Sequence, residues 1–120
     1  MRIYYCLPLT DSDGGILVHD FEVEIEGRLV VDPNECALLV DHVWKERDKP
    51  RAGGGFDTTF VDLMASRDAT WRTIGLHIAI RARQDPDLLA EAMAAEGVVY
   101  IGKGANDPDG RFVDLQAEAA

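Results

Sequence analysis

The sequence predicts an α+β fold, with a hairpin at each end of the chain in one mostly antiparallel or mixed sheet and two or three helices packed on one face. Residues 20–26 alternate carboxylate and apolar side chains, which is the period of a half-buried strand. Two helix-start signals follow, Asp32-Pro33 and Asp85-Pro86. The apolar runs 98–101 and 112–115 flank a turn cluster. The mixture of patterns favours α+β over an all-helical or all-strand fold.

Residues 2–9 and 16–26 are expected to form the first hairpin, because a cluster of Asp and Gly separates two strand-like runs. Pairing Tyr5 with Phe21 places the apolar side chains of both strands on one face. This register also predicts two facing pairs, Arg2 with Glu24 and Cys6 with Asp20. After the second strand, Gly27 indicates a tight turn or a bulge.

A helix is predicted over residues 33–48, with Asp32 as the cap and Pro33 at the first helical position. Apolar residues follow at helical spacing, namely Cys36, Leu39, Val40 and Val43. Residues 58–67 also fit a helix, with Asp57 as its cap.

Residues 71–83 fit two structures. Isoleucine and leucine at 74, 76, 78 and 80 alternate with small or polar residues, which favours a strand, whereas Trp71, Ile74 and Ile78 fit a helix continued from residue 58. We favour the strand. A helix is expected from Asp85-Pro86 to Gly97, followed by a strand at 98–101, so the three elements would form a parallel strand–helix–strand crossover. Residues 1–120 are expected to form a single domain, with 116–120 as a frayed tail.

The chain of 120 residues is 47% hydrophobic and carries a net charge of −10. The acids lie mainly at the two ends, since residues 33–84 hold eight bases against seven acids. A basic stripe for nucleic acid is therefore not expected, and a basic protein partner fits better. Without a signal-peptide pattern or an apolar span, we expect a soluble, cytoplasmic protein without a membrane partner.

No residue set predicts catalysis, a metal site or a cofactor. Cys6 faces an acid in the predicted register, and Cys36 lies among apolar residues, so neither has an activating base. His19 is expected to be a hydrogen-bonded core residue, and His42 with Glu46 offers two ligands where a zinc site needs more. His77 would join them only through the tertiary structure.

The loop after residue 48 is a candidate anion site, because its cations and bare glycine amides precede the helix predicted from residue 58. Its residues are Lys49, Arg51, Gly53, Gly54 and Gly55. It lacks the Lys-Ser/Thr that follows the glycines of a P-loop. A mobile connection is the simpler interpretation.

Four carboxylates on one strand face form the main candidate binding site: Asp20, Glu22, Glu24 and Glu26. They could serve only to keep an exposed sheet soluble and unaggregated. The functional interpretation is a non-enzymatic binding protein, such as an inhibitor or nucleic-acid mimic, whose acidic face meets a basic protein surface. Two alternatives are a homo-oligomeric assembly protein and a small-ligand domain or enzyme using His42, His77 or the 53–55 loop.

Overall fold

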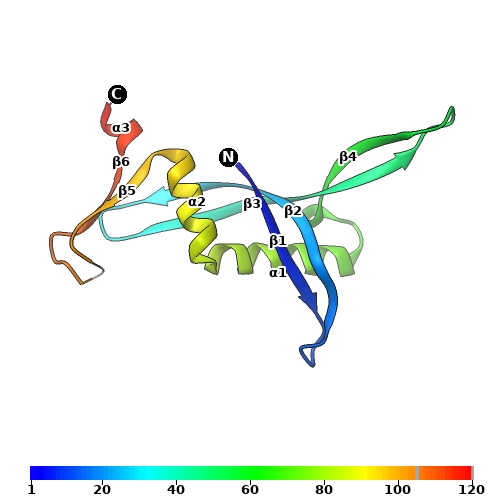
Figure 1. Ribbon diagram of the computed structural model, residues 1–120, viewed down its shortest axis with the longest axis horizontal. Coiled ribbons are helices and arrows are strands. Elements are labelled where there is room, and N and C mark those ends of the chain that lie inside the picture. The colour runs from blue at the N-terminus through cyan, green and yellow to red at the C-terminus, as the bar shows by residue number, and fades with distance from the viewer. Residues whose placement is uncertain (105, 120) are drawn as a thin grey trace.

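The computed structural model describes residues 1–104 and 106–119, and in this part of the chain it contains a four-stranded antiparallel sheet, a separate two-stranded sheet and three α-helices (Figure 1). The strands are β1 (Arg2–Thr10), β2 (Ile16–Val31), β3 (Cys36–Pro50), β4 (Phe56–Asp62), β5 (Val98–Ile101) and β6 (Arg111–Asp114). The helices are α1 (Ala69–Gln84), α2 (Pro86–Glu96) and α3 (Leu115–Ala119), with a 3-10 turn, η1, at Leu63–Ala65. The predicted α+β class is confirmed, although β5 and β6 pair with each other and do not extend the larger sheet.

The N-terminal hairpin is confirmed, but most of its register differs from the prediction by two residues. Thr10 pairs with Ile16, which fits the predicted offset, but irregularities around Leu9 then shift the ladder so that Leu7 faces Phe21 and Tyr5 faces Val23. Because a two-residue shift keeps every side chain on its own face, the predicted core face is still correct.

His19 was expected in the core and is instead exposed. It lies near the start of β2, where five consecutive residues, 16–20, are exposed on both faces of the strand. These residues belong to the hairpin arm that projects from the body of the protein (Figure 1). The prediction failed because alternation gives the face of a residue but not whether anything packs against that face.

The predicted helix at 33–48 is wrong, because this segment is the tight turn before β3 and then β3 itself. The Asp32 carboxylate accepts hydrogen bonds from the backbone N–H groups of Asn34 and Glu35, at 2.8 Å each. A helix cap makes the same bonds, but here the Asp32 and Glu35 backbones pair with each other across a hairpin turn. Local side-chain bonding of this kind serves turns as well as helices.

A bulge explains why the apolar spacing in β3 resembled that of a helix. Glu26 pairs with His42 and Gly27 pairs with Val40, so Asp41 is an extra residue in the ladder. The side chains of β3 therefore change faces at this point, and the alternation of buried residues is interrupted. The bulge also settles the two options for Gly27, since β2 continues through it to Val31.

Two further predictions in the middle of the chain are wrong. Residues 56–62 form β4, and Asp62 caps η1, so Asp57 caps no helix. The favoured strand over 74–83 is helix α1, capped by Asp68. Its buried face is helical in period, and the apparent alternation came from two exposed apolar residues, Leu76 and Ile80. With α1 in place of that strand, the predicted parallel crossover does not form.

The C-terminal third agrees with its sequence signals. Asp85 caps α2, Pro86 is its first residue, and Gly97 ends it in a left-handed conformation with φ of 72°. The strand over 98–101 and the return strand are confirmed as β5 and β6. Helix α3 covers most of the segment that was expected to fray, and Ala120 lies outside the described residues, so fraying stays a prediction.

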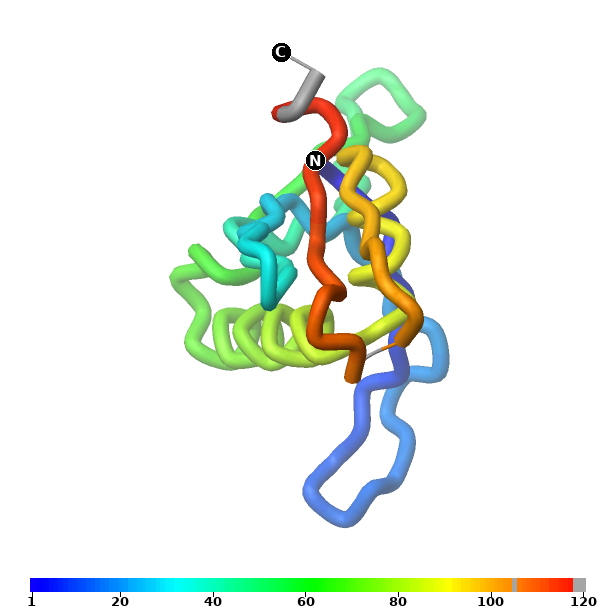
Figure 2. Tube along the Cα trace, turned by 90° about the vertical axis from the view of Figure 1, so that its left-hand side faces the viewer, coloured from blue at the N-terminus to red at the C-terminus, as the bar shows by residue number. Residues whose placement is uncertain are grey.

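The core lies between one face of the large sheet and helices α1 and α2, and we call this the inner face (Figure 2). It buries sheet residues such as Val23, Ile25 and Val43 against Ile78 and Ala82 of α1. The opposite, outer face carries the side chains that alternate with these. Of the helices in the described residues, none combines the length and apolar character that crossing a membrane would require.

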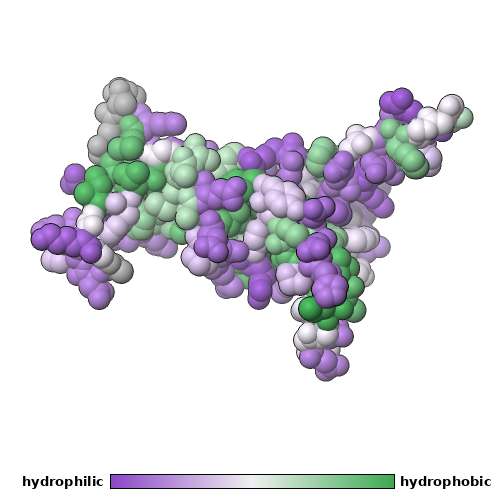
Figure 3. Space-filling view, viewed as in Figure 1, coloured by the Kyte–Doolittle hydropathy of each residue, from purple (hydrophilic) through white to green (hydrophobic). Residues whose placement is uncertain are grey.

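Two hairpin arms extend from this body, one from β1 and β2 and the other from β3 and β4 (Figure 1). The molecule accordingly measures 59 × 40 × 22 Å along its principal axes. Figure 3 shows hydrophobic surface on the β1–β2 arm, where Ile16, Leu17 and Val18 are exposed.

Candidate functional site

The outer face of the sheet holds the predicted acidic residues. Glu24 stands in one row with Tyr4 and Trp44, and Glu26 stands in the next with Arg2 and His42. These rows arise because the strands pair antiparallel and each second residue points outward. Of the four predicted acids, Glu22, Glu24 and Glu26 therefore lie on a surface shared with aromatic and cationic side chains.

Each of the four acids has a polar neighbour within the protein. Glu22 accepts a 2.6 Å hydrogen bond from the Tyr4 hydroxyl. Glu24 forms a 2.8 Å ion pair with Arg2. The remaining two contacts are longer: Glu26 Oε2 lies 3.7 Å from His42 Nε2, and Asp20 Oδ1 lies 3.9 Å from Cys6 Sγ. The face is thus less negative than its four carboxylates alone would make it.

The Tyr4 hydroxyl donates its hydrogen bond to the Glu22 carboxylate, so deprotonation of Tyr4 would place two negative charges side by side. The hydrogen bond to the Glu22 carboxylate is the largest cause of a strongly raised pKa of the Tyr4 hydroxyl. Tyr4 therefore remains a neutral donor at physiological pH.

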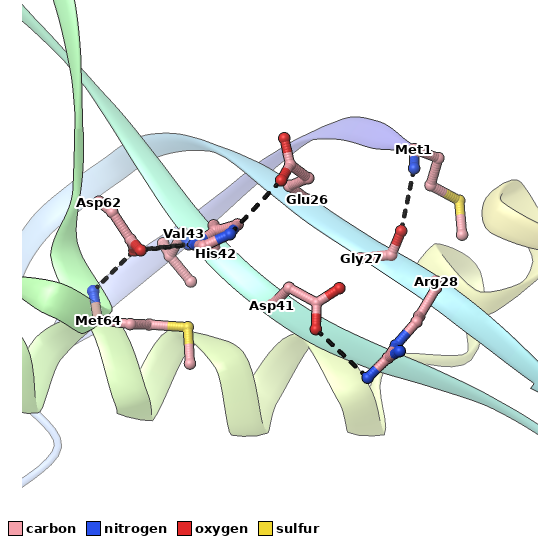
Figure 4. Close-up of polar contacts among 9 residues, drawn as sticks. All are labelled: Met1, Glu26, Gly27, Arg28, Asp41, His42, Val43, Asp62 and Met64. Carbon is pink, nitrogen blue, oxygen red and sulfur yellow. Dashed lines mark hydrogen bonds and ion pairs between the residues drawn. The ribbon is translucent and has the colours of Figure 1, made fainter.

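His42 links two of the acidic side chains across β2, β3 and β4 (Figure 4). Its Nδ1 lies 2.7 Å from Asp62 Oδ2, and the Asp62 side chain is only 13% exposed. Asp62 Oδ1 also accepts hydrogen bonds from the backbone N–H groups of Val43 and Met64. The hydrogen bond with Asp62 is the main cause of a raised pKa for His42, and the charge of Glu26 adds to it.

We expect protonated His42 to stabilise the fold. Because its folded-state pKa is above the ordinary 6.5, its contribution is fully present below that pH and is lost as pH rises through the folded-state pKa. The melting-temperature difference between wild type and His42→Gln should shrink over this range. Thermal melts across pH, with an NMR titration of His42, measure both quantities.

Asp62→Asn is the control for this prediction, since Asn keeps an oxygen for the Val43 and Met64 N–H groups but carries no charge. In that variant the pKa of His42 should move back towards its ordinary value. A His42 resonance that titrates identically in both proteins would contradict the assignment of Asp62 as the cause.

A small hollow of about 90 Å³ opens on the outer face beside the acids. Its walls include Tyr4, Glu22, Glu24, Trp44, Glu46 and Phe60. The guanidinium carbon of Arg2 lies 5.3 Å from the Trp44 ring centroid and 5.1 Å from that of Phe60, within cation–π range. Two aromatic rings and a carboxylate thus hold one arginine of this chain.

Sequence reasoning missed the aromatic part of this site. Trp44 and Phe60 were assigned to helices, and helical spacing does not bring them to one side of a sheet. Trp44 of β3 pairs with Asp62 of β4, and Phe60 of β4 pairs with Glu46 of β3. The one available signal was the alternation of Trp44, Glu46 and Asp48 with Lys45, Arg47 and Lys49, a period-2 pattern typical of a strand with two different faces.

The structure places the other candidate residues apart from the acidic face. The 53–55 loop is the tip of the β3–β4 arm, and the element that follows it is strand β4. The anion hypothesis required a helix N-terminus after this loop, and there is none at this place. Arg51 pairs with Asp57 at 2.5 Å across that tip. His77 is exposed on α1, Cys6 is exposed on β1, and burial raises the pKa of the Cys36 thiol.

His42 and Glu46 do share a side of β3, as the prediction assumed for a helix, but Trp44 lies between them in the strand. Among the described residues, no group of three or more His, Cys, Asp or Glu side chains is arranged to hold a metal ion. The chain matches no protein-family model, and comparisons with curated proteins and with solved structures found no match either. The function is therefore argued from the geometry of the outer face.

Proposed function

We propose that this protein is a non-enzymatic binding protein whose outer sheet face captures arginine side chains of a basic protein partner. The observation that carries the proposal is the placement of Arg2 over Trp44 and Phe60, paired with Glu24. A partner's guanidinium would find the same chemistry in the adjoining hollow, where Glu22 and Glu46 add carboxylates. Arginine combines charge with a planar group that stacks on rings.

The internal ion pairs favour single arginine contacts over an evenly charged ladder. Glu24 and Glu26 already face cationic or titratable groups of this chain, so the face does not repeat charge as a nucleic-acid backbone does. Inhibition of a nucleic-acid-binding protein fits this proposal where the inhibited surface is rich in arginine. The overall charge of −10 would speed encounter with such a surface.

Binding of short peptides tests the proposal. Peptides that alternate glycine with arginine, lysine or glutamate are titrated into the protein by calorimetry. The arginine peptide should bind at least about threefold more tightly than the lysine peptide, since only arginine adds planar stacking to charge. The glutamate peptide should not bind.

The variant Phe60→Leu tests how much ring stacking contributes to arginine binding. Phe60 is 44% exposed, so replacing its ring leaves the core intact. It should remove most of the preference for arginine. Phe56→Leu, at the tip of the β3–β4 arm and 68% exposed, is the matched control and should keep the preference. Equal binding of arginine and lysine peptides to the wild-type protein would exclude ring-assisted capture.

A homo-oligomeric assembly protein is the second candidate, favoured by the exposed apolar residues of the two arms. Leu17 and Phe56 are each 68% exposed, one on each arm. Exposed apolar groups of this kind mark association surfaces in soluble proteins. Light scattering of the peptide-free protein measures its molar mass in solution. An assembly protein should have the mass of an oligomer, whereas arginine capture by the outer face needs only a monomer.

A further inference from the structure

A second, larger hollow lies on the inner face, where the start of α1 and η1 meet β3 and β4. Its volume is about 270 Å³, close to the lower end of the range of roughly 300–1,000 Å³ that small-molecule sites occupy. Its lining residues are Lys45, Arg47, Val61, Asp62, Leu63, Ala65, Ser66 and Trp71. It faces away from the acidic hollow, because Lys45 and Arg47 alternate along β3 with Trp44 and Glu46.

The apolar part of this inner hollow is built around aromatic rings. Trp71 is stacked on Phe21, with centroids 6.2 Å apart and 23° between the planes. The Lys45 ammonium lies 4.8 Å from the Phe21 ring centroid. The side chains of Val61 and Leu63 complete the wall. An aromatic ring entering the hollow would meet a surface that is mostly apolar.

Two cations give the inner hollow its charge. Lys45 donates one hydrogen bond, of 3.1 Å, to the Glu22 carbonyl oxygen and keeps two further protons for other acceptors. Among the ion pairs of the described residues, none involves Lys45 or Arg47. An anion in the hollow would therefore gain both charges without breaking an existing pair.

Asp62 is the acid in the lining, and its charge is already offset. Its two oxygens bind His42 and the backbone N–H groups of Val43 and Met64, and its side chain is 13% exposed. An anion would be repelled more by a free carboxylate than by one engaged in these contacts. The hollow thus combines an apolar cavity with a net positive lining.

We propose that the inner hollow binds a small aromatic carboxylate, with its ring against Trp71 and its carboxylate between Lys45 and Arg47. The bidentate geometry of a guanidinium suits a carboxylate, and the cavity volume suits one or two fused rings. This site is distinct from the arginine-binding face, since Lys45 and Arg47 lie on the opposite side of β3 from Trp44 and Glu46.

The probe for the test is 2-naphthoate, with the neutral 2-naphthylmethanol as its matched analogue. The chain has two tryptophans, so an ¹⁵N–¹H spectrum contains two indole N–H signals to follow. The Trp71 signal should shift with saturable dependence on 2-naphthoate, while the Trp44 signal on the outer face should stay in place. The neutral analogue should bind at least about tenfold more weakly, because it lacks the charge that the two cations attract.

Arg47→Met removes one cation and retains an apolar side chain, and it should weaken binding of 2-naphthoate by about tenfold. Arg111→Met, at the exposed first residue of β6, removes the same charge elsewhere and should leave binding unchanged. The Trp44 signal reports that each variant is folded. Equal affinity for the acid and the alcohol, an unmoved Trp71 signal, or equal effects of the two arginine variants would overturn the proposal.

Discussion

Replacing Glu22 and Glu46 together with lysine is expected to weaken binding of the glycine–arginine peptide by about a hundredfold or more. Both carboxylates line the outer-face hollow, and reversing them turns attraction into repulsion at short range. Glu24 is left unchanged because it pairs with Arg2. Calorimetry at low and moderate salt measures the loss, which should be larger at low salt because ions screen exposed charges.

The matched control for this charge reversal is Glu91→Lys with Asp109→Lys. These exposed residues lie on α2 and in the loop before β6, so the change in net charge is the same while the hollow is untouched. The control should lose only the small, long-range part of the attraction. If both double variants lose affinity equally, net charge alone drives binding and the hollow is not the site.

Gly27→Ala is expected to lower the free energy of unfolding by about 2 kcal/mol or more. A Cβ at this position would overlap the backbone carbonyl oxygen of Leu39, which is part of the sheet and has no flexible end to move away. Gly27 also exchanges two backbone hydrogen bonds of 3.0 Å with Met1, one of which is drawn in Figure 4, so the start of the chain is tied to β2 at this position. Urea denaturation measures the difference.

Gly53→Ala is the control, since a Cβ there would meet nothing within 4 Å and the residue has no positive φ. It should change the free energy of unfolding by less than about 0.5 kcal/mol. A Gly27→Ala protein as stable as wild type would show that the bulge can open without cost, and the close approach of β2 and β3 would not be required.

The sequence by itself determined the elements whose signals are local and complete. The α2 helix carries its own start and stop, Asp85-Pro86 and Gly97, because the cap and the left-handed residue act on their nearest backbone groups. The face of β2 was equally predictable, since alternation over 20–26 has only one interpretation. The four acids of the candidate site followed from that face.

The tertiary structure decided what depends on pairing between distant residues. The turn at Asp32 makes the hydrogen bonds of a helix cap, and only the pairing of β2 with β3 distinguishes the two. The bulge opposite Gly27 then changed the period of β3, and two exposed residues of α1 imitated a strand. In each case the local pattern fitted two structures, and strand pairing and burial against the rest of the chain selected one.

The same reason explains why only part of the candidate site was visible in the sequence. Glu22 and Glu24 stand on one strand, so their common face follows from the period of two. Trp44 and Phe60 reach that face from β3 and β4, and Arg2 reaches it from β1. The register decides which side chains meet across neighbouring strands. In this sheet the register depends on irregularities at Leu9 and Gly27, and the periodicity of the residues does not predict them.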